Sequence, residues 1–143
     1  MSQEQMKETF RTVIEAAYGA GKLEALDDLF APDFEEHQAG ITPPTLEGLK
    51  GSIAYLRNAF PDLKVTIEEM AVDGDRLWAR LSGRGTHRGT FASVPPTGKP
   101  FTVTVMDEAR FKGGRIVEHW GVADQLALMV QIGALPGPAQ SRS

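Results

Sequence analysis

The sequence contains no cysteine among its 143 residues. Disulfide bonds, thiolate nucleophiles and cysteine zinc sites are therefore excluded. A long apolar run is also missing, because the longest uninterrupted hydrophobic stretch is LALMV at 126–130, far too short to span a membrane. The first ten residues, MSQEQMKETF, are too polar for a secretion signal. We therefore expect a cytoplasmic protein that has no membrane partner.

An excess of basic residues is lacking as well. Fifteen Lys and Arg residues face nineteen Asp and Glu residues, which gives a formal net charge of −4. No basic stripe is available to neutralise phosphates, so we expect no nucleic-acid partner. Hydrophobic residues make up 41% of the chain, enough for the core of a single domain. We assign that domain to residues 1–133 and predict that the aperiodic tail at 134–143 is flexible.

Helices come first along the chain. Apolar residues at helical spacing predict helices over about 3–18, 23–29 and 45–60. Ser2 and Gln5 fit a capping box at the first helix, and Thr45 is placed to cap the third. We expect residues 34–44 to form a loop that borders any ligand pocket.

Strands follow the helices. Alternation of apolar and polar residues predicts strands from Val65 to the Asp73–Gly74 turn, then over about 76–84, 101–111 and 115–122. Asp124 can cap a short final helix. This order predicts an α+β fold, a cone-shaped α+β barrel in which N-terminal helices pack on a curved, mostly antiparallel sheet. The open end of such a cone is a natural small-molecule pocket.

Several common site motifs are absent. The glycines at 83, 85 and 89 miss the dinucleotide-binding spacing by one residue, and no helix is predicted after them. The three histidines, His37, His87 and His119, do not have the spacing of metal ligands, so we predict no metal site. No G-x-S-x-G nucleophile motif occurs.

Asp107 is the candidate that the strand pattern singles out. It shares one face of the predicted 101–111 strand with apolar residues, namely Phe101, Val103, Val105, Ala109 and Phe111. That face should point inward, and burial there should raise the pKa of the Asp107 carboxyl. A carboxyl group in such a place suits proton abstraction near neutral pH.

His119 is the second candidate. The Gly113–Gly114 turn should place Asp107 opposite residue 119 or 120, and His119 faces inward if Val117 does. The two side chains would then share the cavity as catalytic groups. The alternative is structural: Asp107 simply accepts a hydrogen bond from His119 and holds the core together.

Further residues are candidates for ligand contact. Phe101 and Val105 would line the pocket wall, His37 and His87 would border its opening, and Trp78 would offer an aromatic surface. Each has a simpler alternative. His37 and His87 would be exposed histidines, and Trp78 would be a core residue.

The opposite face of the same strands is also apolar. If Asp107 and His119 face inward, then Met106, Ile116, Trp120 and Val122 face outward. Monomers rarely leave such a patch bare, so we expect a homodimer or larger homo-oligomer through this face.

Four segments together resemble one known family. They are FPDL at 60–63, GTHRGTF at 85–91, PPTGK at 95–99 and DEARFKGGRIVEHWGVADQLALMVQIG at 107–133. The chain is similar over about 1–133 to the SnoaL-like polyketide cyclases, also called ester cyclases, of the nuclear-transport-factor-two-like superfamily. The resemblance implies a cone-shaped α+β barrel with an apolar pocket, and homo-oligomers formed through the outer sheet face.

The resemblance also implies an activity. Cyclases of this family close a ring by intramolecular aldol condensation without a metal or organic cofactor, and an acidic side chain moves the proton next to a carbonyl. The family's catalytic aspartate lies two residues after the histidine of the EHW segment, and here that position is Gly121. The position of the family's companion histidine holds Asp107.

We therefore expect a cofactor-independent cyclase or isomerase that acts on an apolar carbonyl compound. Asp107 would be the general base, and His119 would orient it or donate to the developing enolate oxygen. The alternatives are a hydrolase or hydratase in which Asp107 activates water, and a family member that only binds a small ligand.

Overall fold

The computed structural model describes residues 1–137. The helical elements are α1 (Gln3–Thr12), η1 (Val13–Gly19), η2 (Leu23–Asp28), α2 (Leu46–Ala59) and α3 (Gln125–Gln131). The strands are β1 (Phe30–Glu36), β2 (Lys64–Asp73), β3 (Arg76–Thr86), β4 (Pro100–Lys112) and β5 (Arg115–Ala123). They form one sheet in the order β1-β5-β4-β3-β2, in which only β1 and β5 are parallel. The predicted α+β class is confirmed.

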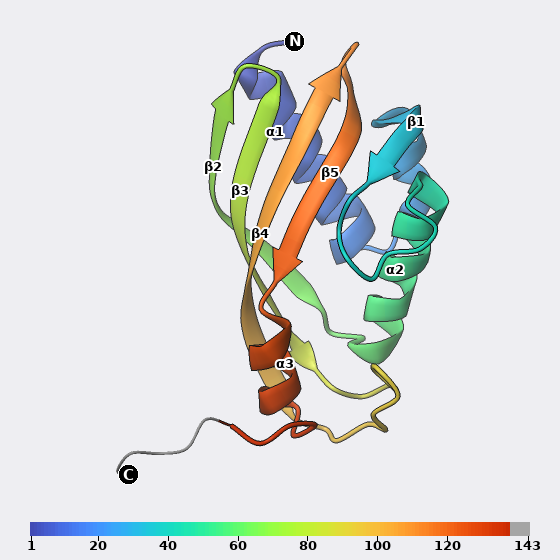
Figure 1. The fold of residues 1–143 in the computed structure, drawn as a ribbon, viewed down its shortest axis with the longest axis vertical. Coiled ribbons are helices and arrows are strands. Elements are labelled where there is room, and N and C mark those ends of the chain that lie inside the picture. The colour runs from blue at the N-terminus through green and yellow to red at the C-terminus, as the bar shows by residue number, and fades with distance from the viewer. Residues whose placement is uncertain (138–143) are drawn as a thin grey trace.

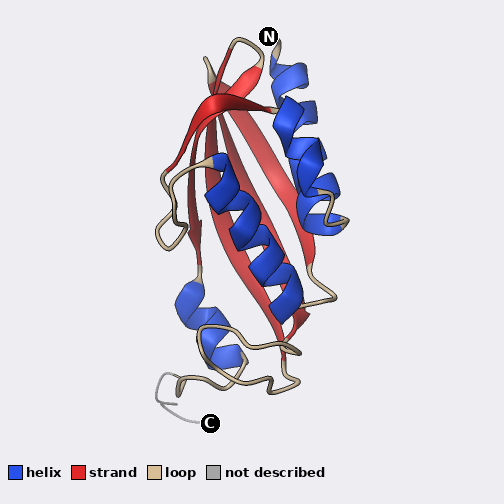
Figure 2. Cartoon of the chain, turned by 90° about the vertical axis from the view of Figure 1, so that its right-hand side faces the viewer, coloured by secondary structure: helices blue, strands red, loops and turns tan. Residues whose placement is uncertain are grey.

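The sheet does not close into the predicted barrel. β1 and β2 are the two edges of the sheet and do not pair with each other (Figure 1). Helices α1 and α2 lie side by side on one face of this curved sheet, and α3 follows β5 at its far end (Figure 2). None of the helices in residues 1–137 is long and apolar enough to cross a membrane. Of the predicted tail, residues 134–137 are neither helix nor strand, and 138–143 lie outside the described residues.

The predicted helix caps are present. The Ser2 hydroxyl accepts from the Gln5 amide at 3.0 Å, and the Gln5 side chain accepts from the Ser2 amide at 2.7 Å. Thr45 accepts from the Gly48 amide, and Asp124 accepts from the Ala127 amide. These bonds satisfy amide groups that a helix leaves free at its first turn, which explains why the elements begin at these residues.

The first helix differs from the prediction in its second half. After Thr12 the chain forms a π-helix over Val13–Gly19, marked by a bond from the Ala20 amide to the Glu15 carbonyl. A π-helix adds a residue to the turn and shifts the direction of the side chains that follow. It places Tyr18 against the sheet, where it lines the cavity described below.

The prediction of a loop beginning at residue 34 was wrong. Residues Phe30–Glu36 form β1, parallel to β5, and the second helix is only a short 3-10 turn. The strand was not predicted because it contains Pro32, and proline is disfavoured within sheets. Proline is tolerated at a sheet edge, however. β1 is such an edge, and it buries Phe34 and Glu36 on the inner side.

A register shift in β5 changes which residues face inward. Arg110 pairs with Glu118, but the next residue, Phe111, pairs with Ile116, so Val117 is left as a bulge. Ile116 is therefore buried, whereas strict alternation predicted it on the outer face. For the same reason Asp107 pairs with Gly121 and not with residue 119 or 120.

Two glycines of α2 provide a matched test of the packing between the helix and the loop before it. A Cβ atom at Gly48 would overlap the carbonyl oxygen of Pro43, whereas one at Gly51 would meet no atom within 4 Å. We expect Gly48→Ala to lower the free energy of unfolding by about 1–3 kcal/mol through overpacking. Gly51→Ala should raise it by up to about 1 kcal/mol through helix propensity. Urea denaturation measures both; equal effects would contradict this packing.

Candidate functional site

A cavity of about 650 Å³ lies between the helices and the inner face of the sheet. Most of its wall is apolar and includes Phe60, Phe91, Phe101, Val103 and Val105. The predicted wall residues Phe101 and Val105 thus line it. Residues 38–41, which follow β1, border it as well. The cavity has the size and apolar lining typical of a small-molecule site.

Asp107 provides the carboxyl group in this wall. Its side chain is only 9% exposed, and it points inward from β4 among apolar neighbours, as the alternation of the strand predicts. Atom Oδ1 is buried and has no hydrogen-bond partner among the described residues. Tyr18 and Gln38 are among the other polar residues that line the same cavity. An unsatisfied buried acceptor is rare in a native structure, and it marks this carboxyl group as a candidate functional group.

His119 lies between two carboxyl groups. Its Nδ1 is 2.7 Å from Oε2 of Glu36 and 2.9 Å from Oε1, and its Nε2 is 3.3 Å from Oδ1 of Asp107. The contact with Glu36 is a well-formed hydrogen bond, whereas the contact with Asp107 is an ion pair of poorer alignment. His119 lines a small hollow of about 20 Å³ with Asp107 and Tyr18, and not the main cavity.

Glu36 is the residue of this group that sequence reasoning missed. Its side chain is fully buried at the end of β1, where it also accepts from the Gln38 amide at 2.9 Å. The missed signal is its two-residue spacing from Phe34, which marks both as inward-facing once 30–36 is recognised as a strand.

The surroundings of His119 favour its charged form. Burial by itself would lower the pKa of the imidazole, but the close contact with Asp107, the hydrogen bond to Glu36 and the negative charges of both groups outweigh it and raise the pKa to about 10. The pKa of Tyr18 is raised as well, but here burial acts in the same direction as the charges. Burial, together with the negative charges of Asp107 and Glu36, raises the pKa of its phenol well above the usual value, so Tyr18 keeps its proton and is a hydrogen-bond donor.

Two predicted ligand contacts lie away from the cavity. Trp78 is 49% exposed on the outer face of β3, because Leu77 and Ala79 take the inward positions. His87 is fully buried, neither at the cavity opening nor on the surface as predicted. Its Nδ1 accepts from the Thr97 amide at 3.2 Å, so it holds the loop between β3 and β4.

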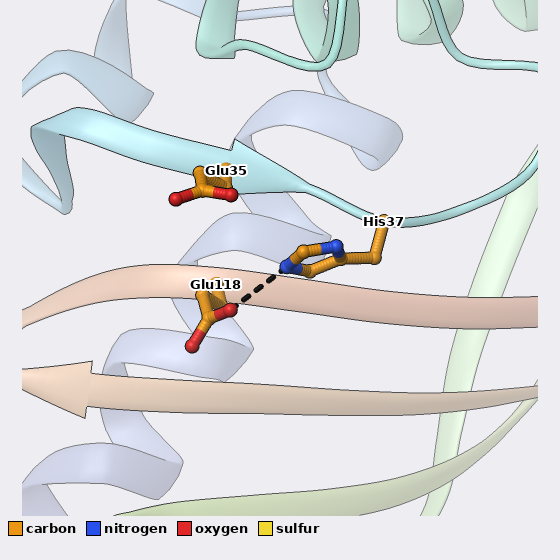
Figure 3. A group of neighbouring side chains, drawn as sticks. All are labelled: Glu35, His37 and Glu118. Atoms are coloured by element: carbon orange, nitrogen blue, oxygen red, sulfur yellow. Dashed lines mark hydrogen bonds and ion pairs between the residues drawn. The ribbon is translucent and has the colours of Figure 1, made fainter.

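His37 also lies outside the cavity, on the outer side of β5. It stacks on Trp120 with ring centroids 4.6 Å apart, and its Nε2 is 2.8 Å from Oε2 of Glu118. Glu35 lies beside this pair (Figure 3), and the three side chains offer ligand atoms within 4.8 Å of one another. Glu118 is already paired with Arg110 at 2.5 Å, and we interpret the group as an ion-pair network at the surface.

The raised pKa of His119 predicts how stability depends on pH. The folded chain holds this proton up to about pH 10, whereas an unfolded histidine loses it near pH 6.5. The contribution of His119 is therefore complete below pH 6.5 and is lost as the pH rises towards 10. We expect the melting temperature to fall between pH 7 and pH 10, and to fall less in His119→Gln than in the control His37→Gln. Equal slopes in the two variants would contradict the assignment.

Comparison with known proteins agrees with this architecture. TsrD from Streptomyces laurentii is 26% identical, with a TM-score of 0.86 over 94% of this chain and 99% of that chain. IdmH from Streptomyces antibioticus, described as a candidate polyketide cyclase, is 36% identical, with a TM-score of 0.79 over 89% and 97%. AclR from Streptomyces galilaeus, described as a candidate hydroxylase, is 26% identical, with a TM-score of 0.85 over 97% and 87%.

No curated protein sequence matches the chain. A family model described as "SnoaL-like polyketide cyclase" matches residues 8–132, which include all the strands and the groups around the cavity. The chain therefore belongs to the SnoaL-like polyketide cyclase family.

Proposed function

We propose that the protein is a cofactor-independent cyclase or isomerase that moves a proton next to the carbonyl group of an apolar compound bound in the cavity. The observation that carries this proposal is the position of Asp107. Its nearly buried carboxyl group lies at the wall of a 650 Å³ apolar cavity and has an oxygen without a hydrogen-bond partner among the described residues. A core filled by side chains would have favoured a structural role, but here there is room for a ligand beside the carboxyl group.

Asp107 acts as the general base in this proposal. Its carboxylate takes the proton from the carbon next to a carbonyl, and the electron pair of that C–H bond forms an enolate. The enolate carbon then attacks a second carbonyl in the same molecule and forms the ring C–C bond. The resulting alkoxide takes the proton back from Asp107, so that no metal, oxidant or further reactant is required.

Tyr18 stabilises the enolate oxygen in this proposal. It lines the cavity together with Asp107, and its hydroxyl remains protonated because its pKa is raised. A neutral hydroxyl that donates into an apolar site stabilises developing negative charge without prior reorganisation. His119 does not line the main cavity, and both of its nitrogens face carboxyl groups. We therefore assign to His119 the positioning of Asp107, and to Tyr18 the donation of the hydrogen bond.

Gly121 explains how the acid can lie on β4 in this chain. The family resemblance places the usual catalytic aspartate at this position of β5. A Cβ atom at Gly121 would lie 2.7 Å from Oδ1 of Asp107 and would overlap Oε1 of Gln38. The Asp107 carboxyl group thus occupies the space above Gly121, which supports the interpretation that the acid has moved across the strand pair.

Proton exchange on a carbon acid tests this proposal without knowledge of the natural substrate. In D₂O, 2-acetyl-1-tetralone should exchange the hydrogen between its carbonyl groups faster with the protein than without it, as followed by ¹H NMR. Asp107→Asn should lower the protein-dependent rate about a hundredfold, because the amide cannot accept the proton. Glu118→Gln, which removes a carboxylate from the outer side of β5, should leave the rate unchanged. An Asp107→Asn variant that exchanges as fast as the wild type would refute the proposal.

The outer face of the sheet supports the expectation of a homodimer, which forms part of this proposal. Trp78, Met106 and Val122 lie on neighbouring strands and are 49%, 53% and 72% exposed. Large apolar side chains gathered on one face are typical of a contact between subunits. Ile116 is buried and does not contribute to this face, in contrast to the expectation.

Light scattering tests the homodimer. The wild type should have a mass of about twice the 15.5 kDa of one chain at micromolar concentration. Met106→Glu should shift it to the mass of one chain, because a carboxylate would be buried without a partner in the contact. Ala54→Glu, on the exposed side of α2, is the control and should leave the mass unchanged. A wild-type mass of 15.5 kDa would refute the dimer.

A further inference from the structure

The cavity has an unusual balance of charge. Among the described residues that line it, none is Lys, Arg or His, and Asp107 is the only acid. The remaining polar groups are neutral hydroxyls and amides, those of Tyr18, Tyr55, Ser52, Gln38 and Gln125. A ligand with a negative charge would therefore meet no cation inside the cavity. Burial of an unpaired charge is among the most costly events in a protein interior.

The groups behind the cavity wall make the interior more negative. Asp107 and Glu36, on β4 and β1, both face His119 on β5, and the phenol of Tyr18 on η1 stays uncharged. One imidazolium can balance only one of the two carboxylates. With both carboxyls ionised the group has a formal charge of −1. Oδ1 of Asp107 lies 3.3 Å from Nε2 of His119 but has no hydrogen-bond partner within residues 1–137.

We propose that the cavity also binds apolar molecules that end in a protonated amine, and that Asp107 holds the ammonium group. An ammonium donates up to three hydrogen bonds to the Asp107 carboxyl group at the cavity wall, and it offsets the unbalanced carboxylate. The apolar body of the ligand would lie against Phe60, Phe101 and Val103. A carboxylate or phosphate at the same place would be repelled by Asp107. This inference shares its site with the proposed function but does not require turnover.

Three probes of one size and shape separate charge from fit. They are 2-naphthylmethylamine, which is an ammonium at pH 7, the neutral ketone 2-acetylnaphthalene, and the anion 2-naphthoate. Isothermal titration calorimetry at pH 7 and low salt measures each dissociation constant. We expect the ammonium to bind at least tenfold more tightly than the carboxylate. A smaller ratio in the wild type would overturn the inference.

Variants then assign the preference to Asp107. Asp107→Asn removes the charge with little change of shape and should reduce the ratio of ammonium to carboxylate affinity at least fivefold. Glu36→Gln leaves Asp107 in place but removes the second carboxylate, and it should lower the same ratio by a smaller factor; it serves as the test if Asp107→Asn does not fold. Glu118→Gln removes an equal charge from the outer side of β5 and should keep the wild-type ratio. A preference that survives in both Asp107→Asn and Glu36→Gln would overturn the inference.

The result can be read separately from that of the proton-exchange experiment. A protein that prefers the ammonium but does not accelerate exchange on the diketone contradicts only the proposed function. A protein that accelerates exchange but binds the three probes equally contradicts only the present inference. The ketone probe connects the two, because the proposed function requires that a neutral carbonyl compound enters the cavity.

Discussion

The imidazolium of His119, held between the carboxyl groups of Glu36 and Asp107, joins three strands at one point. Glu36 belongs to the edge strand β1, Asp107 to β4, and His119 to β5 between them. Such a buried charged group gives a protein little net stability, because desolvation of the charges offsets most of their attraction. Removal of one partner, however, leaves an unpaired buried charge. The arrangement therefore constrains the register of the β1 end and fixes where Asp107 can lie.

The polar part of the cavity wall depends on this group of Glu36, His119 and Asp107 and on the π-helix η1. The π-helix η1 brings Tyr18 to the same wall, and the chain that leaves β1 supplies Gln38. Asp107, Tyr18 and Gln38 thus form a polar part of the cavity wall, whereas most of the remaining wall is aromatic or aliphatic. A polar end and an apolar body in one cavity are what an asymmetric small molecule requires: the apolar wall binds, and the few polar groups orient.

Most of the fold could be predicted from the sequence because its local signals agree with the tertiary structure. The capping residues, the Asp73–Gly74 turn and the alternation of 101–111 all correspond to elements of the structure. The exceptions have physical causes. Pro32 concealed β1, and the bulge at Val117 moved Ile116 inward, which strict alternation cannot foresee. Asp107 and His119 were found because a charged residue on an apolar face is conspicuous. Glu36 was not, because its strand was not recognised.

Gly121 has a consequence for how such a site can change over evolutionary time. The space above this glycine holds the Asp107 carboxyl group, so positions 107 and 121 compete for one volume. An aspartate at 121 would crowd a second carboxylate against the first, and loss of Asp107 alone would leave the site without its acid. In the function proposed above, a move of the acid from position 121 on β5 to position 107 on β4 therefore involves both positions together.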